Sequence, residues 1–332
     1  MRAVAALSLT GRYAPFARQA AAGLRAWAGA AGASLRIDDD RSDPAESGRL
    51  LARLARGADL VFGPYGSGPA REAARAMAGR PEVVWNHGGA EVPDRGARMI
   101  DVLGPARSYW RGLPEVLGGE DPGRVVVVRA PGGFGAAVAE GAVHALAGAG
   151  APPPEVLDLA ESGPEACASA ARAAGAAWVV GGGRAEDDLA LGRALAGRGP
   201  RAGLVVCGVE LAARELGDAV AGWIGPAQWA PGAASPPVPL PPGSDYPAAQ
   251  ALAAGLLAAQ ALELAGSARP DALWDAARAL RATTFLGPFA VDERGRQVAH
   301  APLIVRWEGS GARLRREVVW RPGPGGVRES TA

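Results

Sequence analysis

Residues 59–79 read DLVFGPYGSGPAREAARAMAG, and this stretch decides how the first part of the chain folds. Its apolar start at 60–62 predicts a short buried strand, which a loop of small residues follows. Pro69 then predicts the first turn of a helix, where the N–H that proline lacks would have no partner. Ser67 is therefore expected beside free N–H groups and a helix dipole, which favour an anion such as a carboxylate. In the alternative interpretation, the glycines and Pro69 only turn the chain between strand and helix.

A second loop of small residues follows the next predicted strand. Residues 83–85 predict this strand, and residues 86–91 (NHGGAE) come directly after it. Open parallel α/β sheets bind ligands at the edge formed by the carboxyl ends of their strands. We therefore expect the two loops to lie at one edge of a sheet, where a ligand would bind.

The order of strand, loop and helix recurs along the chain. A near-continuous apolar run at 3–9 predicts a strand buried on both faces of a parallel sheet. The alternation restarts at 125–128 and continues to a last strand at 220–224, and Asp245 begins the longest predicted helix. Because 332 residues are too many for one ordinary core, we expect an α/β protein with two lobes.

Charge, histidine spacing and hydropathy argue against several classes of protein. The 35 basic residues are scattered among 34 acidic ones, so nucleic-acid binding is not expected. The three histidines are far apart in sequence, and no metal site is expected. The sequence contains no run of about 18 apolar residues, so no membrane span is expected. Cys167 and Cys207 could pair, but two small buried apolar side chains are the favoured interpretation.

No motif indicates a cofactor or catalysis. Glycines 181–183 follow a predicted strand, but Glu186 stands where the dinucleotide motif GxGxxG requires its third glycine. Tyr65 stands two residues before Ser67, so the nucleophile motif GxSxG is missing as well. We therefore expect no cofactor, and an enzyme is disfavoured because no histidine or aspartate can be assigned to Ser67 as a catalytic partner.

Acidic residues Asp38, Asp39 and Asp40 end the second predicted strand. Three aspartates at a strand end could suggest a Mg²⁺ site. The following sequence favours a simpler interpretation, in which Asp43 caps a helix that begins at Pro44. The three aspartates are then expected to be solvated.

Other charged and aromatic residues also lie at the ends of predicted elements. Glu210 could accept the ammonium group of a ligand, or could cap the helix predicted at 211–216. Arg184 could pair with an anionic ligand group or be solvated. Five aromatic residues near the expected cleft could line it or, at least as often, pack in the core: Phe16, Tyr65, Trp85, Phe134 and Trp229.

The order of several short segments resembles a known family. The segments are LSLTGRYAPFARQAAAGL, DDDRSDPAES, VFGPYGSGPA, VVWNHGGAEV, LLAAQALELAG and TTFLGPFAVDERGRQV. Together they are similar to the type I periplasmic binding proteins, in particular the branched-chain amino-acid (Leu/Ile/Val) receptors of ABC importers. The resemblance implies two Rossmann-like lobes joined by three hinge strands, with a ligand cleft between them. It implies a first lobe of 1–102 plus 229–300, a second of 106–226 plus 302–321, and a tail at 322–332.

The resemblance also implies a role for residues of the first lobe. In relatives a serine of the first loop and nearby backbone groups hold the ligand α-carboxylate, and Ser67 with Gly66 matches that serine. The second loop matches at Gly88, Gly89 and Ala90, where relatives usually carry a hydroxyl that Ala90 lacks. Phe16 stands where relatives often carry an aromatic residue, whereas Tyr65 and Trp85 are candidates only because they lie near the expected cleft.

In the second lobe, the resemblance implies that Glu210 binds the α-ammonium group. Phe134 matches a tyrosine that stacks on the ligand in relatives. Arg184 stands where relatives often carry another aromatic residue, and could admit a ligand with an extra anionic group. These residues complete the candidate ligand-binding set.

The implied function is capture of a small amino acid or related carboxylate, by cleft closure, for delivery to an ABC permease. The implied location is periplasmic or extracytoplasmic. A strand-like run begins at Ala3, however, and leaves no space for a signal peptide, so either a signal was removed or the protein is cytoplasmic. A cytoplasmic ligand sensor of the same fold is therefore the alternative.

Overall fold

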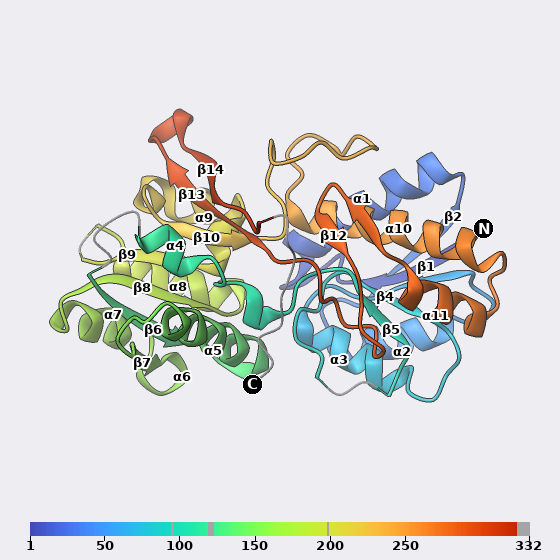
Figure 1. Ribbon diagram of the computed structural model, residues 1–332, viewed down its shortest axis with the longest axis horizontal. Helices are drawn as coiled ribbons and strands as arrows, with labels where there is room; N and C mark the ends of the chain where they lie inside the picture. Colours follow the sequence, from blue (N-terminus) through green and yellow to red (C-terminus); the bar gives the residue numbers. More distant parts are fainter. Residues whose placement is uncertain (94–95, 119–122, 198, 324–332) are drawn as a thin grey trace. The chain divides into compact units, whose positions relative to one another are not determined.

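The computed structural model describes residues 1–93, 96–118, 123–197 and 199–323. The chain forms two compact units and passes from one to the other after Gly104, Ala230 and His300. In Figure 1 the first unit is drawn in blue to cyan and in gold to orange, and the second in green to yellow and in red.

The limits of the units differ slightly from the expected lobes. Unit 1 comprises Met1–Gly104 and Pro231–His300. Unit 2 comprises Pro105–Ala230 and the described residues from Ala301 onward, so Trp229 belongs to unit 2 and not to the first lobe as expected. Of the tail expected at 322–332, residues 324–332 lie outside the described residues.

Unit 1 is built on a parallel sheet with the strand order β2-β1-β3-β4-β5. The strands are β1 (Arg2–Leu7), β2 (Ser34–Asp39), β3 (Leu60–Phe62), β4 (Val84–Asn86) and β5 (Met99–Asp101). The helices are α1 (Ala14–Ala31), α2 (Pro44–Leu54), α3 (Ser67–Ala76), α10 (Tyr246–Ala265) and α11 (Pro270–Ala279). The short hairpin of β11 (Ala282–Thr284) and β12 (Gly287–Phe289) completes the unit.

Strand β1 is buried on both faces, as its apolar run predicts. Ala3, Ala5 and Leu7 join the core cluster that contains residues of α1 and α10. Val4 and Ala6 point to the opposite face and join the cluster that contains residues of α2 and α3. Because successive side chains of a strand alternate between faces, one continuous apolar run supports helices on both sides of the sheet.

Helix α10 lies beside α1 in Figure 1, and the two helices share one core cluster. Gly255 permits this approach, because a Cβ at that position would overlap the ring of Trp27. Among the described residues, α10 is the one helix long and apolar enough to cross a membrane, which the sequence prediction did not recognise. Its most apolar window is 61% buried inside the protein, as expected of a core helix.

Unit 2 is built on a mixed sheet with the strand order β14-β13-β10-β9-β8-β6-β7, in which β13 runs antiparallel to both of its neighbours, β10 and β14. The strands are β6 (Arg124–Arg129), β7 (Glu155–Asp158), β8 (Ala176–Gly182), β9 (Arg201–Leu204), β10 (Ile224–Ala227), β13 (Leu303–Glu308) and β14 (Arg315–Trp320). The α-helices are α4 (Leu113–Gly118), α5 (Gly132–Gly148), α6 (Leu159–Ser162), α7 (Pro164–Ala173), α8 (Ala185–Leu195) and α9 (Leu211–Leu216). The 3₁₀ helices are η1 (Ala106–Ser108), η2 (Val205–Gly208), η3 (Gly217–Val220) and η4 (Gly311–Arg313).

Two local predictions for unit 2 were wrong in detail. Gly181 and Gly182 belong to strand β8, whereas the sequence predicted a loop there. A strand was also predicted at 204–207, but β9 ends at Leu204 and Cys207 lies in η2. Cys207 and Cys167 are both buried and unpaired, in agreement with the favoured interpretation.

Two aspartates at the end of β2 hold the loop that follows β1. The sequence predicted that they would be solvated, and this prediction was wrong. Asp39 accepts hydrogen bonds from the N–H groups of Leu9 (2.9 Å), Thr10 (3.2 Å) and Arg41 (2.9 Å), and from the Thr10 hydroxyl (2.8 Å). Asp40 is fully buried and accepts from Ser8 Oγ at 2.6 Å. Burial raises the pKa of Asp40, although hydrogen bonds oppose the shift. Asp43, by contrast, caps α2 as predicted.

Asp188 ties two strand ends together in unit 2. Its Oδ1 accepts the N–H of Gly183, which follows β8, at 2.7 Å, and its Oδ2 accepts the N–H of Val206 in η2 at 2.9 Å. The side chain is buried, and burial raises the pKa of Asp188 to about 7 against the hydrogen bonds that favour the anion. Asp188 therefore positions the segments that lead to Arg184 and Glu210.

Replacement of Asp39 with alanine tests the tie at β2. We expect Asp39→Ala to lower the free energy of unfolding by about 1.5–3 kcal/mol, because several hydrogen bonds to one charged acceptor are lost. Chemical unfolding followed by circular dichroism measures the change. Asp38→Ala is the matched control, since among the described residues Asp38 pairs with the exposed guanidinium groups of Arg36 and Arg53, and a loss of about 1 kcal/mol or less is expected. Equal losses in the two variants would contradict the role of Asp39.

The raised pKa of Asp188 predicts a pH-dependent contribution to stability. The folded protein holds the Asp188 proton more tightly than the unfolded chain, so the contribution is largest near pH 4 and is lost as pH rises towards 7. Asparagine does not titrate. The difference in unfolding free energy between wild type and Asp188→Asn should therefore shrink as pH rises through this window. Parallel pH profiles for the two proteins would refute the prediction.

Candidate functional site

The first half of the candidate site lies at the start of α3. The helix begins at Ser67, two residues before the predicted start at Pro69, and Gly66 precedes it with φ of 100°. In the part of the chain that the structure describes, the N–H groups of Ser67 and Gly68 have no hydrogen-bond partner. Two free donors at a helix N-terminus create the local positive potential that the sequence predicted for Ser67.

The second loop lies directly against this helix start. The N–H of Gly66 donates to the carbonyl of Gly88 at 2.9 Å, and Tyr65 forms a parallel bridge with Gly88. The N–H of Glu91 donates to Ser67 Oγ at 3.1 Å. The structure therefore brings together the residues predicted from the two loops, including Ala90 beside Glu91.

Asn86, which sequence reasoning missed, shapes the second loop. Its Oδ1 accepts the N–H groups of Gly88 (3.4 Å) and Gly89 (2.9 Å), and its Nδ2 donates to the Gly89 carbonyl and to Asp101 Oδ1, each at 2.7 Å. The N–H groups of Gly88 and Gly89 are therefore engaged inside the loop. An asparagine at a strand end before two glycines is the sequence signal for such a turn.

The predicted aromatic residues of unit 1 occupy two different environments. Phe16 stacks on Tyr65, with ring centroids 5.5 Å apart and planes within 6°. Trp85 instead is fully buried in the core cluster of α1 and α10, where it supports β4. A direct contact of Trp85 with a ligand therefore stays a prediction that the packing disfavours.

His87 lies between Trp85 and Gly88 and adds no positive charge to the loop. Its side chain is fully buried. Burial lowers the pKa of His87 to about 4, so the imidazole is neutral at pH 7. An anion at this half of the site would therefore rely on neutral N–H and O–H donors.

The predicted residues of unit 2 follow the carboxyl ends of the neighbouring strands β6, β8 and β9. Phe134 lies in the first turn of α5 and packs edge-on against Tyr109, with ring centroids 5.6 Å apart. Arg184 precedes α8 and forms two hydrogen bonds with Asp187 of that helix, at 2.8 and 3.0 Å. Its charge is therefore balanced locally, as the helix N-terminus favours an acid there.

Glu210 has a partner that the sequence did not reveal. Nη2 and Nε of Arg316 donate to its Oε1 at 2.8 and 3.2 Å. Glu210 precedes α9 but does not cap it through its side chain, so the capping alternative is wrong. Arg316 lies in β14, 106 positions later in the chain, and no local pattern links the two residues.

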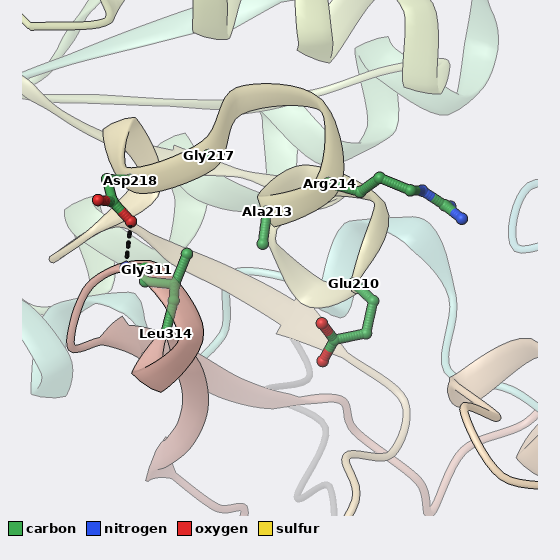
Figure 2. A pocket seen from close by; sticks show the side chains of 7 residues that line it. All are labelled: Glu210, Ala213, Arg214, Gly217, Asp218, Gly311 and Leu314. Atoms are coloured by element: carbon green, nitrogen blue, oxygen red, sulfur yellow. Dashed lines mark hydrogen bonds between the residues drawn. The ribbon is translucent and has the colours of Figure 1, made fainter.

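A shallow pocket of about 470 Å³ lies beside Glu210 in unit 2. It is lined by Glu210, Ala213, Arg214, Gly217, Asp218, Gly311 and Leu314 (Figure 2). Asp218 accepts the N–H of Gly311 at 2.6 Å across this pocket. Within the described ranges, no group of three or more histidine, cysteine, aspartate or glutamate side chains is arranged to hold a metal ion.

Comparison with known proteins identifies the family. The family model for periplasmic binding proteins matches residues 4–312. A comparison with curated protein sequences found no match. Similar solved structures include a leucine-binding protein, LivK, of Thermotoga maritima, with 16% identity, 97% of this chain and 99% of that chain covered, and a TM-score of 0.83.

Two further solved structures show the same fold. A solute-binding protein of an ABC transporter from R. palustris, in complex with 4-hydroxybenzoate, shares 16% identity over 96% of each chain, with a TM-score of 0.80. An amino-acid ABC transporter substrate-binding protein from Pseudomonas fluorescens shares 16% identity over 96% of this chain and 95% of that chain, with a TM-score of 0.79. By the match of the family model over most of its length, this chain belongs to the periplasmic binding protein family.

Proposed function

We propose that this protein captures a small amino acid or related carboxylate and delivers it to an ABC permease, without chemical change of the solute. Family membership supports the binding role. The observation that carries the carboxylate is the start of α3, where the N–H groups of Ser67 and Gly68 have no partner among the described residues. An extracytoplasmic location belongs to the same proposal.

The hydroxyl of Ser67 adds a third donor to the N–H groups of Ser67 and Gly68. We call these three donors the carboxylate cradle. A serine hydroxyl has one proton to donate and can accept two hydrogen bonds. Ser67 Oγ already accepts the N–H of Glu91, which fixes its position, and it donates to no residue in the described chain. Its proton is therefore left for a ligand oxygen. Charge-assisted hydrogen bonds of this kind contribute about 1.5–3 kcal/mol each.

The ligands of similar structures are consistent with a carboxylate at this position. One similar protein is named for leucine, and another was solved with 4-hydroxybenzoate. Leucine and 4-hydroxybenzoate share a carboxylate but little else. We propose that Ser67, Gly68 and Ala90 hold the carboxylate.

The cradle depends on how closely the two loops approach. A Cβ at Gly88 would lie 2.6 Å from Cα of Tyr65 and 2.7 Å from the carbonyl of Pro64, both backbone atoms. Real side chains do not approach backbone so closely, so any larger residue at 88 must push the second loop away from the first. The hydrogen bond between Glu91 and Ser67 would then lengthen.

Loss of the Ser67 hydroxyl should weaken solute binding. We expect Ser67→Ala to reduce affinity about tenfold or more, measured by calorimetry with the tightest carboxylate from a panel of leucine, phenylalanine, succinate and 4-hydroxybenzoate. The control is Ser34→Ala, because Ser34 is an exposed serine at the amino end of β2, and this variant should bind normally. If the two variants bind equally well, the carboxylate is held elsewhere.

Gly88→Ala should weaken binding through the loops and not through a lost donor. We expect a loss of about 1–3 kcal/mol in stability together with weaker binding of the same carboxylate. The control is Gly29→Ala in α1, where a Cβ meets nothing within 4 Å and alanine favours the helix. Thermal unfolding and calorimetry of both variants test this. Normal binding by Gly88→Ala would show that the loops tolerate separation.

A further inference from the structure

Strand β2 forms an open edge of the sheet in unit 1. It is an end strand of that sheet and pairs with β1 along one side. The N–H of Ser34 donates to the carbonyl of Met1 at 3.0 Å, and the N–H of Asp40 donates to the carbonyl of Leu7 at 3.2 Å. Successive residues of a strand turn their N–H and C=O groups to opposite sides. The even-numbered residues of β2 therefore face β1, and the odd-numbered residues point these groups outward.

The outward groups belong to Leu35, Ile37 and Asp39. Their N–H groups have no hydrogen-bond partner in the part of the chain that the structure describes. The side chains of Leu35 and Ile37 pack against the core cluster of α1 and α10, but they are only half-buried. An open row of backbone donors and acceptors beside half-buried apolar side chains is a template for one more strand.

The other end strands of the two large sheets are less suited to pair with a further strand. At β5, the N–H of Asp101 donates to the carbonyl of Gly295 at 2.8 Å, so this edge is partly covered. Strand β14 carries a bulge at Val319, and a bulge twists an edge away from a flat partner. The charged residues of β7, Glu155 and Asp158, are both acids, so β7 cannot match opposite charges against its own copy.

Arg36 and Asp38 give β2 a charge pattern that is complementary to itself. Nε of Arg36 donates to Asp38 Oδ1 at 2.9 Å, and Nη2 of Arg53 lies 3.1 Å from Asp38 Oδ2. Charged side chains on an edge strand commonly oppose pairing. Here the two signs stand two positions apart, so an antiparallel copy centred on Ile37 places Arg36 opposite Asp38 of the second copy, and Asp38 opposite its Arg36. Opposite charges at facing positions of neighbouring strands attract.

The same register pairs the outward backbone groups. Ile37 faces Ile37 of the second copy, and Leu35 faces its Asp39, so residues with outward N–H and C=O groups meet each other. If the centre shifts by one residue in either direction, Arg36 stands opposite Arg36, or Asp38 opposite Asp38. Like charges directly opposite each other are destabilising, so the charge pattern selects one register.

We propose that the edge of β2, residues 34–39, is a contact surface for a second copy of this chain, which joins it as an antiparallel strand across a two-fold axis. The sheets of two first units then continue into each other. Stable protein interfaces bury about 1,200–2,000 Å² in total, more than one strand edge supplies. The dimer is therefore weak and forms at high protein concentration. The proposal is independent of the solute that the protein binds.

Sedimentation equilibrium of the wild-type chain tests for the dimer. The protein is measured at concentrations from about 1 µM to about 1 mM, the range in which a weak pair dissociates. We expect the average mass to rise with concentration from one copy towards two. A mass that stays at one copy at the highest concentration overturns the proposal. A mass that rises beyond two copies contradicts a closed two-fold pair.

Charge variants test whether β2 is the contact surface. Arg36→Asp sets acids opposite acids and should weaken dimerisation about tenfold or more. Addition of Asp38→Arg to this variant restores opposite charges and should recover part of the lost affinity. Arg49→Asp is the matched control, because Arg49 is an exposed arginine of α2 that pairs with Glu46 at 2.6 Å, and its replacement changes the net charge equally. Equal weakening by Arg36→Asp and Arg49→Asp would refute β2 as the contact surface.

Discussion

Backbone N–H groups at the carboxyl ends of parallel strands must find acceptors, and this requirement shapes both units. Asp39 collects three such groups in unit 1, and Asp188 collects two in unit 2. Asn86 does the same for Gly88 and Gly89. Buried or shielded N–H groups are costly when unpaired, so these three side chains hold the loops in one conformation. Among the described residues, the N–H groups of Ser67 and Gly68 differ from these, because they have no hydrogen-bond partner.

The charges of unit 2 are balanced locally. Arg184 pairs with Asp187 of the helix it precedes, and Glu210 pairs with the buried Arg316. Arg184 and Glu210 each carry a formal charge, and both charges are therefore neutralised within the unit. An external ion is attracted by one member of such a pair and repelled by the other. A surface of paired charges therefore has little preference for cations or anions.

Helix packing explains why the two loops of unit 1 begin from fixed positions. Strand β1 is buried on both faces, with Ala3, Ala5 and Leu7 against α1 and α10, and Val4 and Ala6 against α2 and α3. Trp85 belongs to the first of these clusters, directly before the loop that approaches Ser67. A packed interior does not deform continuously, so the loops start from fixed points. The core thus limits the freedom of the two loops.

Local features of this protein were determined by the sequence alone. Asp43 and Pro44 start α2, Asp245 starts α10, and the small-residue loop before α3 follows a buried strand, because caps, prolines and apolar periodicity act over only a few residues. Tertiary structure alone decided that Asp40 is buried, that Trp85 joins the core, and that Glu210 is bound by Arg316. These outcomes depend on contacts between residues far apart in the sequence, 106 positions for Glu210 and Arg316, and no local propensity encodes which distant side chain will pack there.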